Sequence, residues 1–306
     1  HNGTGVPVLF HYDGTLYPGS RLDCTYIESN WVLDGYLGTS SDYTSNNGFI
    51  GTTNPTWIAA GLSTNTSNAE EIVISYDGSH FYEANTISGI EFYDIKYGIS
   101  SEGTSIWVGA AKHMSSYTGV SMRYSTDGIC WKAGRGAGAD MVGRSVSYSL
   151  YTGTGGTSLW TATGYNPTGT TNLIYSTDGF SWENSTGASF QSSGFGITYG
   201  LSSDGTSLWA AVGQQNDGVN SNLLYSTDGI SWQYSTGVSF GSTGRGLAIT
   251  YGLSSFSTGT CMWVAVGQQK DSINSNILYS TNGSVWLNSS GLSFAGGEGQ
   301  TVAYGL

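Results

Sequence analysis

YSTDGISW at residues 225–232 decides the fold, because related copies recur along the chain as YSTDGICW (124–131), YSTDGFSW (175–182), YSTNGSVW (279–286) and the weaker ISYDGSHF (74–81). Asp-Gly between two strand-forming stretches is a strong short-range signal for a β-hairpin, and we expect a type I′ turn with positive φ at both central residues. The Asp or Asn oxygen can also accept backbone N–H bonds across the turn. The motif therefore predicts five hairpins whose structural turn residues are Asp77, Asp127, Asp178, Asp228 and Asn282.

All ten tryptophans fall into two columns that repeat about every fifty residues. The first column is Trp57, Trp107, Trp160, Trp209 and Trp263, and the second is Trp31, Phe81, Trp131, Trp182, Trp232 and Trp286. Steps in the second column are 50, 50, 51, 50 and 54, and continuing from the last tryptophan through the C-terminus to the first takes 51 more. Fixed periods of this length are typical of propellers, solenoids or arrays. A period that closes on itself predicts a ring.

Each period reads as four short strands. The most complete copy gives ITYG (197–200), SLWAAVG (207–213), NLLYS (222–226) and ISWQYS (230–235). Alternate side chains of a strand point to opposite faces, and both faces of the second strand are apolar. Such a strand must be covered on both sides, so the pattern predicts a four-stranded antiparallel blade packed between two neighbouring blades.

The hairpin motif resembles the Asp-box (BNR) repeat of sialidase-like β-propellers, S-x-D-x-G-x-x-W between the third and fourth strands. The residue between Asp and Gly is missing in all five copies here. The resemblance covers nearly the whole chain as a repeat and implies a propeller architecture. It does not imply one activity, because Asp boxes occur in hydrolases, receptors and assembly factors alike.

The two ends of the chain together complete one further copy of the unit. GQTVAYGL (299–306) matches the first strand, while residues 6–10, about 21–28, and the segment opening at Trp31 match the other three. We therefore expect one domain over residues 1–306, an all-β, six-bladed β-propeller whose ring closes when the C-terminal strand joins the N-terminal blade. Closure would leave no open sheet edge.

The composition argues against two classes of binding partner. The net charge is −12, from 21 acidic and nine basic residues, and no Lys/Arg cluster occurs, which argues against nucleic acid and anionic membranes. No apolar run approaches the roughly 18 residues that a membrane span needs. The chain starts at His1, and we expect that a secretion signal was removed, which predicts an extracellular protein or one on a cell or virion surface. Possible N-glycosylation sites are Asn2, Asn65, Asn184 and Asn288.

The cysteines do not indicate a metal site, and we expect no cofactor. Cys24, Cys130 and Cys261 are an odd number without short spacing, so neither a zinc site nor a disulfide framework is indicated. We expect buried free thiols.

The loops after the second and fourth strands form the candidate binding face. The Asp-Gly turns on the opposite face are short and repetitive, whereas GQQNDGVNSN (213–222) and its near copy GQQKDSINSN (267–276) are rich in amides that suit sugar hydroxyls or a protein backbone. Arginines 135, 144 and 245 fall in loops of the same face. The candidate residues are Gln214, Gln215, Asn216, Asp217, Gln268, Gln269, Asp271, Arg144 and Arg245.

Catalysis of the sialidase type is not expected. The resemblance implies an arginine triad, a Tyr/Glu nucleophile pair and an acidic Asp, but the chain has five arginines without a matching start motif and few carboxylates on the candidate face. We expect a non-catalytic binding or adhesion head, or a repeating subunit of a surface filament or coat, with a glycan, a protein or copies of itself as partner. A glycan-binding lectin and a sialidase-like glycoside hydrolase remain the alternatives.

Overall fold

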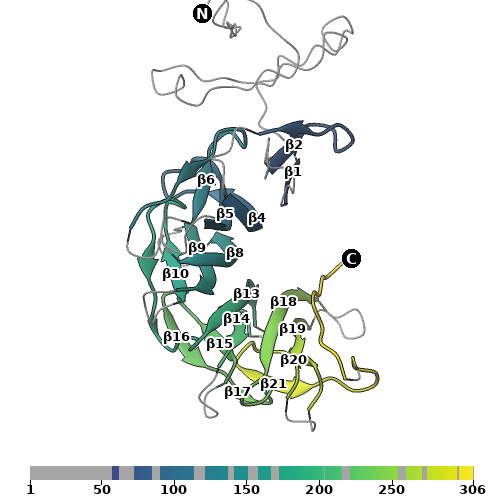
Figure 1. Ribbon diagram of the computed structural model, residues 1–306. Helices are drawn as coiled ribbons and strands as arrows, with labels where there is room; N and C mark the ends of the chain where they lie inside the picture. The colour runs from purple at the N-terminus through teal and green to yellow at the C-terminus, as the bar shows by residue number, and fades with distance from the viewer. Residues whose placement is uncertain are drawn as a thin grey trace, which may run out of the picture. The chain divides into compact units, whose positions relative to one another are not determined.

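The computed structural model describes residues 57–61, 72–84, 90–113, 121–136, 141–150, 158–166, 172–202, 204–215, 221–253, 260–270, 274–294 and 296–305 (Figure 1). Every secondary-structure element assigned in these residues is a β-strand. The described part of the chain contains no helix able to span a membrane. The chain forms two compact units, residues 1–89 with 125–132, and residues 90–124 with 133–306.

The first unit contains one antiparallel sheet of three strands, in the order β1 (Trp57–Ala60), β2 (Ile72–Ser75) and β3 (Tyr82–Glu83). Alternation along β2 buries Ile72 and Ile74. The β1–β2 register pairs Trp57 with Ser75, so the first Trp column meets the start of the Asp-Gly turn.

From β4 onward the chain repeats a four-stranded antiparallel meander, as the tryptophan period predicts. In each meander, strands that follow one another in the chain are neighbours in the sheet (Figure 1). The four meanders are β4 (Ile90–Ile99), β5 (Ser105–His113), β6 (Arg123–Ser125) and β7 (Lys132–Ala133); β8 (Val142–Leu150), β9 (Ser158–Tyr165), β10 (Leu173–Ser176) and β11 (Glu183–Asn184); β13 (Ser193–Leu201), β14 (Ser207–Gln214), β15 (Leu223–Ser226) and β16 (Ser231–Tyr234); and β18 (Arg245–Leu253), β19 (Cys261–Gln268), β20 (Ile277–Ser280) and β21 (Val285–Asn288).

Consecutive meanders pack through their first strands, so that β4, β8, β13 and β18 lie side by side. Glycines make this close approach possible. A Cβ on Gly98 of β4 would come within 2.6 Å of the Tyr148 ring of β8, and Gly200 of β13 lies in the same way against Tyr251 of β18. Meanders that pack in succession through their first strands give a β-propeller-like, all-β fold.

Short parallel ladders join neighbouring meanders at their other edge. β12 (Thr186–Gly187) pairs with β16, and β17 (Thr236–Gly237) pairs with β21. Gly187 and Gly237 have φ values of +83° and +85°, and a Cβ at either position would collide with the backbone carbonyl of Trp232 or Trp286. Glycine therefore occurs five residues after Trp182 and after Trp232, because the chain turns there against the tryptophan of the next meander.

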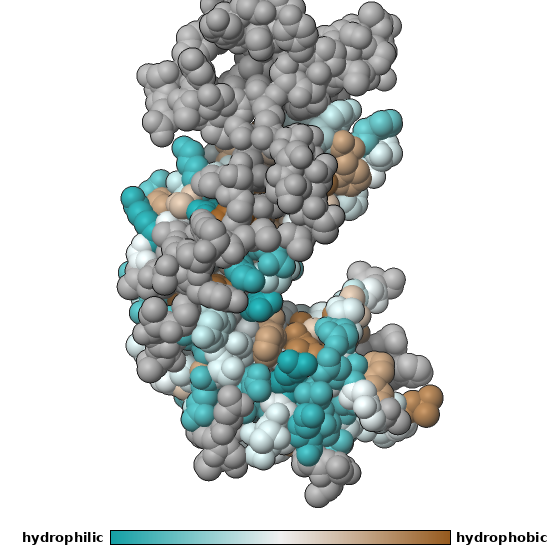
Figure 2. Space-filling model, viewed as in Figure 1, coloured by the Kyte–Doolittle hydropathy of each residue, from teal (hydrophilic) through white to brown (hydrophobic). Residues whose placement is uncertain are grey.

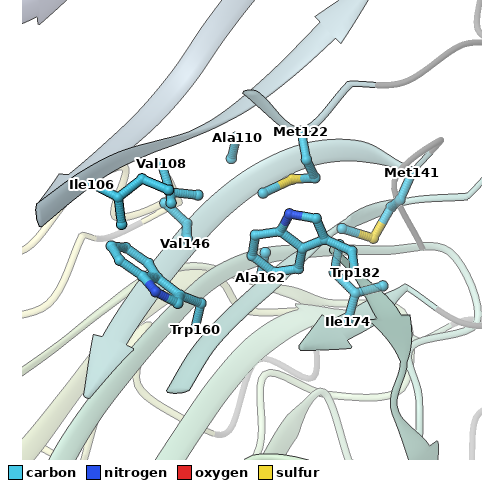
Figure 3. Close-up of a cluster of buried hydrophobic side chains, with 10 residues drawn as sticks. All are labelled: Ile106, Val108, Ala110, Met122, Met141, Val146, Trp160, Ala162, Ile174 and Trp182. Carbon is cyan, nitrogen blue, oxygen red and sulfur yellow. The ribbon is translucent and has the colours of Figure 1, made fainter. Parts of the chain in front are cut away.

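Tryptophans of both columns fill the spaces between meanders. Trp160 and Trp182 belong to one buried cluster with side chains from β5, β8 and β9, so this cluster joins the first two meanders (Figure 3). Trp160 also contacts Tyr148, with ring centroids 4.5 Å apart. The same pairing recurs between Tyr199 and Trp209 at 4.8 Å. Tilted aromatic pairs at this distance add to the gain from burial.

The Asp-Gly turns differ from the expected two-residue hairpin. The last pair of the β15–β16 ladder is Tyr225 with Gln233, so seven residues, 226–232, lie between the two residues of that pair. Asp228 Oδ1 accepts the N–H groups of Ile230 and Ser231 at 2.8 and 2.7 Å, and Ser226 Oγ accepts that of Gly229 at 2.8 Å. The prediction of a two-residue type I′ turn is wrong, because side-chain oxygens of Ser226 and Asp228 accept the backbone N–H groups of the turn in place of carbonyls of a paired strand.

The C-terminal segment lies where a further first strand is expected. Glu298 forms a bridge to Gln268, as Arg245 does to Gln214 one meander earlier. Tyr304 lies against Gly252. Residues 6–37, to which the sequence assigns the rest of this blade, lie outside the described residues.

The cysteines are not all free thiols. Cys261 is free, whereas Cys130 is disulfide-bonded. The prediction of a free thiol is therefore wrong at Cys130.

Candidate binding face

A β-bulge recurs at the start of each first strand in the second unit. The register with the second strand shifts between Phe92 and Asp94, and at the corresponding positions of β8, β13 and β18. A bulge leaves one residue unpaired and redirects its side chain. The four bulge residues, called here the bulge row, are Tyr93, Arg144, Phe195 and Leu247, and each is half-buried.

Arg144 and Tyr93 of the bulge row stack on one another. The Arg144 guanidinium carbon lies 4.2 Å from the centroid of the Tyr93 ring. Its Nε is buried and has no hydrogen-bond partner in the described structure. A cation over an aromatic face is attracted by the ring quadrupole. The pair presents two flat surfaces and N–H donors that are not engaged by carboxylates.

Arg245 is held differently. Its Nη2 donates to Glu298 Oε2 at 3.1 Å, and both side chains are partly exposed. This ion pair links the start of β18 to the C-terminal segment. Arg245 therefore contributes less free charge to the candidate face than Arg144 does.

Gln215 and Gln269 act inside the protein. Gln215 is fully buried, with its Nε2 donating to the Ser189 carbonyl and its Oε1 accepting from the Gln191 backbone N–H, both at 3.0 Å. Gln269 Nε2 donates to the Ser239 carbonyl at 3.0 Å. Each amide thus holds a loop between meanders, because buried polar groups need partners.

The other predicted amides and acids are divided between strand ends and undescribed loops. Gln214 and Gln268 end β14 and β19 and are half-buried beside the bulge row. Gln268 pairs with Arg245 in the β18–β19 ladder. Asn216, Asp217 and Asp271 lie outside the described residues.

Three buried asparagines, not predicted from the sequence, hold the same loops. Asn222 Oδ1 accepts the Phe240 N–H at 2.9 Å, and its Nδ2 donates to the Gly241 carbonyl at 2.9 Å. Asn172 Oδ1 and Asn276 Oδ1 likewise accept the N–H groups of Phe190 and Phe294, while their Nδ2 groups donate to the carbonyls of these same two residues. A signal was present, since each asparagine directly precedes the third strand of its repeat.

Arg135 and the sequon asparagines lie away from the bulge row. Arg135 Nε donates to Ser181 Oγ at 2.9 Å, and its guanidinium lies 5.0 Å from the Phe180 ring, beside an Asp-Gly turn. Asn184 and Asn288 are exposed on β11 and β21. Asn2 and Asn65 lie outside the described residues.

The described carboxylates near the bulge row are already paired. Glu91 lies 3.9 Å from Lys112, and Glu298 is bonded to Arg245. Glu183 instead accepts the Tyr175 hydroxyl at 2.5 Å, which raises the pKa of Tyr175. Within the described residues no group of three or more His, Cys, Asp or Glu side chains could hold a metal ion.

No family model and no curated protein match the chain. Among solved structures, it is similar to a protein of unknown function from Dyadobacter fermentans, with 13% identity, coverage of 66% of this chain and 74% of that one, and a TM-score of 0.36. It is also similar to the GH74 enzyme of Niastella koreensis (20% identity, 80% of this chain, 33% of that one, TM-score 0.44). A GH43 β-1,3-galactosidase gives 11% identity, 72% and 51% coverage, and a TM-score of 0.36. The chain spans a third and a half of those two enzymes' lengths.

Proposed function

We propose that this protein is a non-catalytic β-propeller binding module, placed outside the cell or on a cell or virion surface, that holds a glycan or protein partner at the bulge row. The observation that carries this proposal is the recurrence of the bulge at one position in four adjacent strands. Bulges are enriched beside functional sites because they redirect side chains.

The chemistry of the bulge row suits an uncharged polar partner with flat faces. The residues that contribute most to binding at interfaces are enriched in Trp, Tyr and Arg. Tyr93 and Phe195 are aromatic, and Arg144 adds planar N–H donors. Gln214 and Gln268 stand at adjacent strand ends and can donate to hydroxyls or carbonyls.

The test measures binding to a glycan array and self-association by sedimentation. Phe195→Ala and Leu247→Ser are expected to weaken whichever binding is found, whereas Leu287→Ser is expected to leave it unchanged. Leu287 is a matched control, because it is an exposed leucine on the outer strand β21. Equal binding by all three variants would remove the bulge row from the interface.

A glycoside hydrolase is the alternative that the unpaired Arg144 keeps open. It requires turnover of a glycoside by the purified chain and loss of that turnover in Arg144→Ala. Hydrolysis with this dependence would replace the non-catalytic proposal.

We also propose that residues 298–305 begin a further blade. In the six-bladed ring that the sequence predicts, residues 6–37 supply its other three strands, and the ring closes without a covalent bond.

A further inference from the structure

A second row of side chains lies at the opposite end of the same four strands. Ile99, Leu150, Leu201 and Leu253 each form the last pair of the ladder between a first and a second strand. Their exposed fractions are 39%, 52%, 41% and 46%. We call these four residues the leucine row. Because β4, β8, β13 and β18 lie side by side, the row places four aliphatic side chains at one end of the unit.

The turns that follow two members of the leucine row are tightly bonded. After Leu201, the Ser202 N–H donates to the Thr206 carbonyl at 2.9 Å, and Gly205 adopts a φ of +82°. After Ile99, the Ser100 N–H donates to the Thr104 carbonyl at 2.8 Å. The hydrogen bonds of these turns hold Ile99 and Leu201 in their exposed positions. A partner that covers them therefore loses less free energy to ordering of the backbone.

Carboxylates follow two members of the leucine row. Glu102 and Asp204 lie in the turns that follow Ile99 and Leu201, and both are exposed. Hydrogen bonds from the Ser202 hydroxyl and the Thr206 backbone lower the pKa of Asp204 to about 2, so it is charged at neutral pH.

The Asp-Gly turns belong to the same end and add further acids. The Ser101 N–H donates to the Thr177 carbonyl at 3.0 Å, which joins the turn after Ile99 to the turn of Asp178. Asp178 and Asp228 contribute two more carboxylates. Among the described residues of these turns, Arg135 supplies a positive charge through its contact with Ser181.

We propose that the leucine row is a docking surface for a protein segment that carries aliphatic side chains flanked by Lys and Arg. The proposal goes beyond the binding function at the bulge row, because it concerns the opposite end of the strands. Several apolar side chains exposed at one end mark an interaction site. The acidic border selects a basic partner through electrostatic complementarity.

Charge disfavours a second copy of this chain as the occupant. Two copies meeting through their leucine rows would bring Glu102 and Asp204 against like charges, and each chain carries a net charge of −12. Like charges facing each other across an interface suppress association. Figure 2 shows that apolar residues on the described surface stand among hydrophilic ones.

The probe is an amphipathic helical peptide of Leu and Lys, tested by fluorescence anisotropy against the full chain. Two control peptides carry Ser for every Leu, or Glu for every Lys. We expect binding of the Leu/Lys peptide alone, weakened by high salt because its flanking contacts are ionic.

The protein variants separate docking from general charge attraction. The double variant Leu150→Ser with Leu201→Ser is expected to weaken binding about tenfold or more, since each exposed leucine loses apolar contact area. Leu287→Ser, a leucine of 48% exposure on β21, is the control and is expected to leave binding unchanged. Circular dichroism of both variants checks that the fold is intact.

Two results would overturn the proposal. Equal affinity of the native chain and the double variant would show that the peptide is attracted by charge alone. Concentration-dependent dimers that disappear in Leu201→Ser would assign the leucine row to a second copy. A loss of peptide binding confined to the double variant supports the docking surface, whether or not the bulge row binds its own partner.

Discussion

Gly252 lies against the ring of Tyr304, just as Gly200 lies against Tyr251 one meander earlier. The C-terminal segment thus packs on β18 with the contact that a first strand makes with its predecessor. Glu298 adds an ion pair to Arg245 at 3.1 Å. The C-terminal segment therefore contacts the last meander at Gly252 and Arg245.

Deletion of Gln300–Leu306 removes Tyr304 from Gly252 and exposes the edge of the last meander. We expect a loss of several kcal/mol in the free energy of unfolding, or aggregation, because an uncovered first strand offers free backbone groups. Chemical denaturation and light scattering measure the two effects. A truncated chain that unfolds like the full one would show that this segment does not begin a blade.

Substitution Asp228→Ala removes the acceptor for Ile230 and Ser231. We expect a loss of about 1–2 kcal/mol, the size of a lost capping interaction. Asp228→Asn should be nearly neutral, since Asn282 Oδ1 accepts from Ser284 and Val285 at 3.1 and 2.9 Å. A metal role predicts otherwise, namely an equal loss in both variants and a lower melting temperature with chelator.

The same turns predict acid sensitivity. Burial alone would raise the pKa of Asp228, but hydrogen bonds from the backbone of Ser231 and Ile230 outweigh it and lower the pKa. A carboxyl whose folded-state pKa is depressed stabilises the fold above its ordinary pKa of about 3.9, and this stabilisation is lost as pH falls through the folded-state value. Melting temperatures between neutral pH and pH 2 should therefore fall less steeply for Asp228→Asn than for the native chain.

Alanine substitutions at Gly237 and Gly205 distinguish the cost of a steric collision from the cost of backbone strain. Both have positive φ, +85° and +82°, but a Cβ on Gly237 meets the Trp286 carbonyl while a Cβ on Gly205 meets open space. Gly205→Ala should cost about 1 kcal/mol from strain alone. Gly237→Ala should cost clearly more in urea unfolding; equal losses would contradict the parallel ladder between β17 and β21.

Alkylation tests the disulfide at Cys130. Cys261 is free and Cys130 is disulfide-bonded. We expect one alkylated cysteine in the intact mass of the denatured, unreduced protein. That result favours an oxidising compartment. Three alkylated cysteines would show that Cys130 carries no disulfide in the purified protein.

The period of the tryptophans and the alternation of apolar residues were enough to predict the four-stranded units. Both signals are local, since a strand such as 207–213 carries the evidence for its two buried faces in its own residues. The Asp-Gly motif located each turn. It did not determine the turn geometry, because Ser226 and Asp228 replace strand hydrogen bonds only when the ladder ends at Tyr225.

Only the tertiary structure decided which amides lie at strand ends and which are hydrogen-bonded inside the protein. Gln214 and Gln215 are neighbours in sequence, yet Gln215 is buried and forms hydrogen bonds with Ser189 and Gln191 of the preceding loop. The bulge row and the leucine row likewise depend on strands about fifty residues apart lying side by side. The sequence determined each four-stranded meander, because its strands and turns are formed by residues close together in the chain. Contacts between meanders determined the bulge row and the leucine row, because no single meander contains both sides of such a contact.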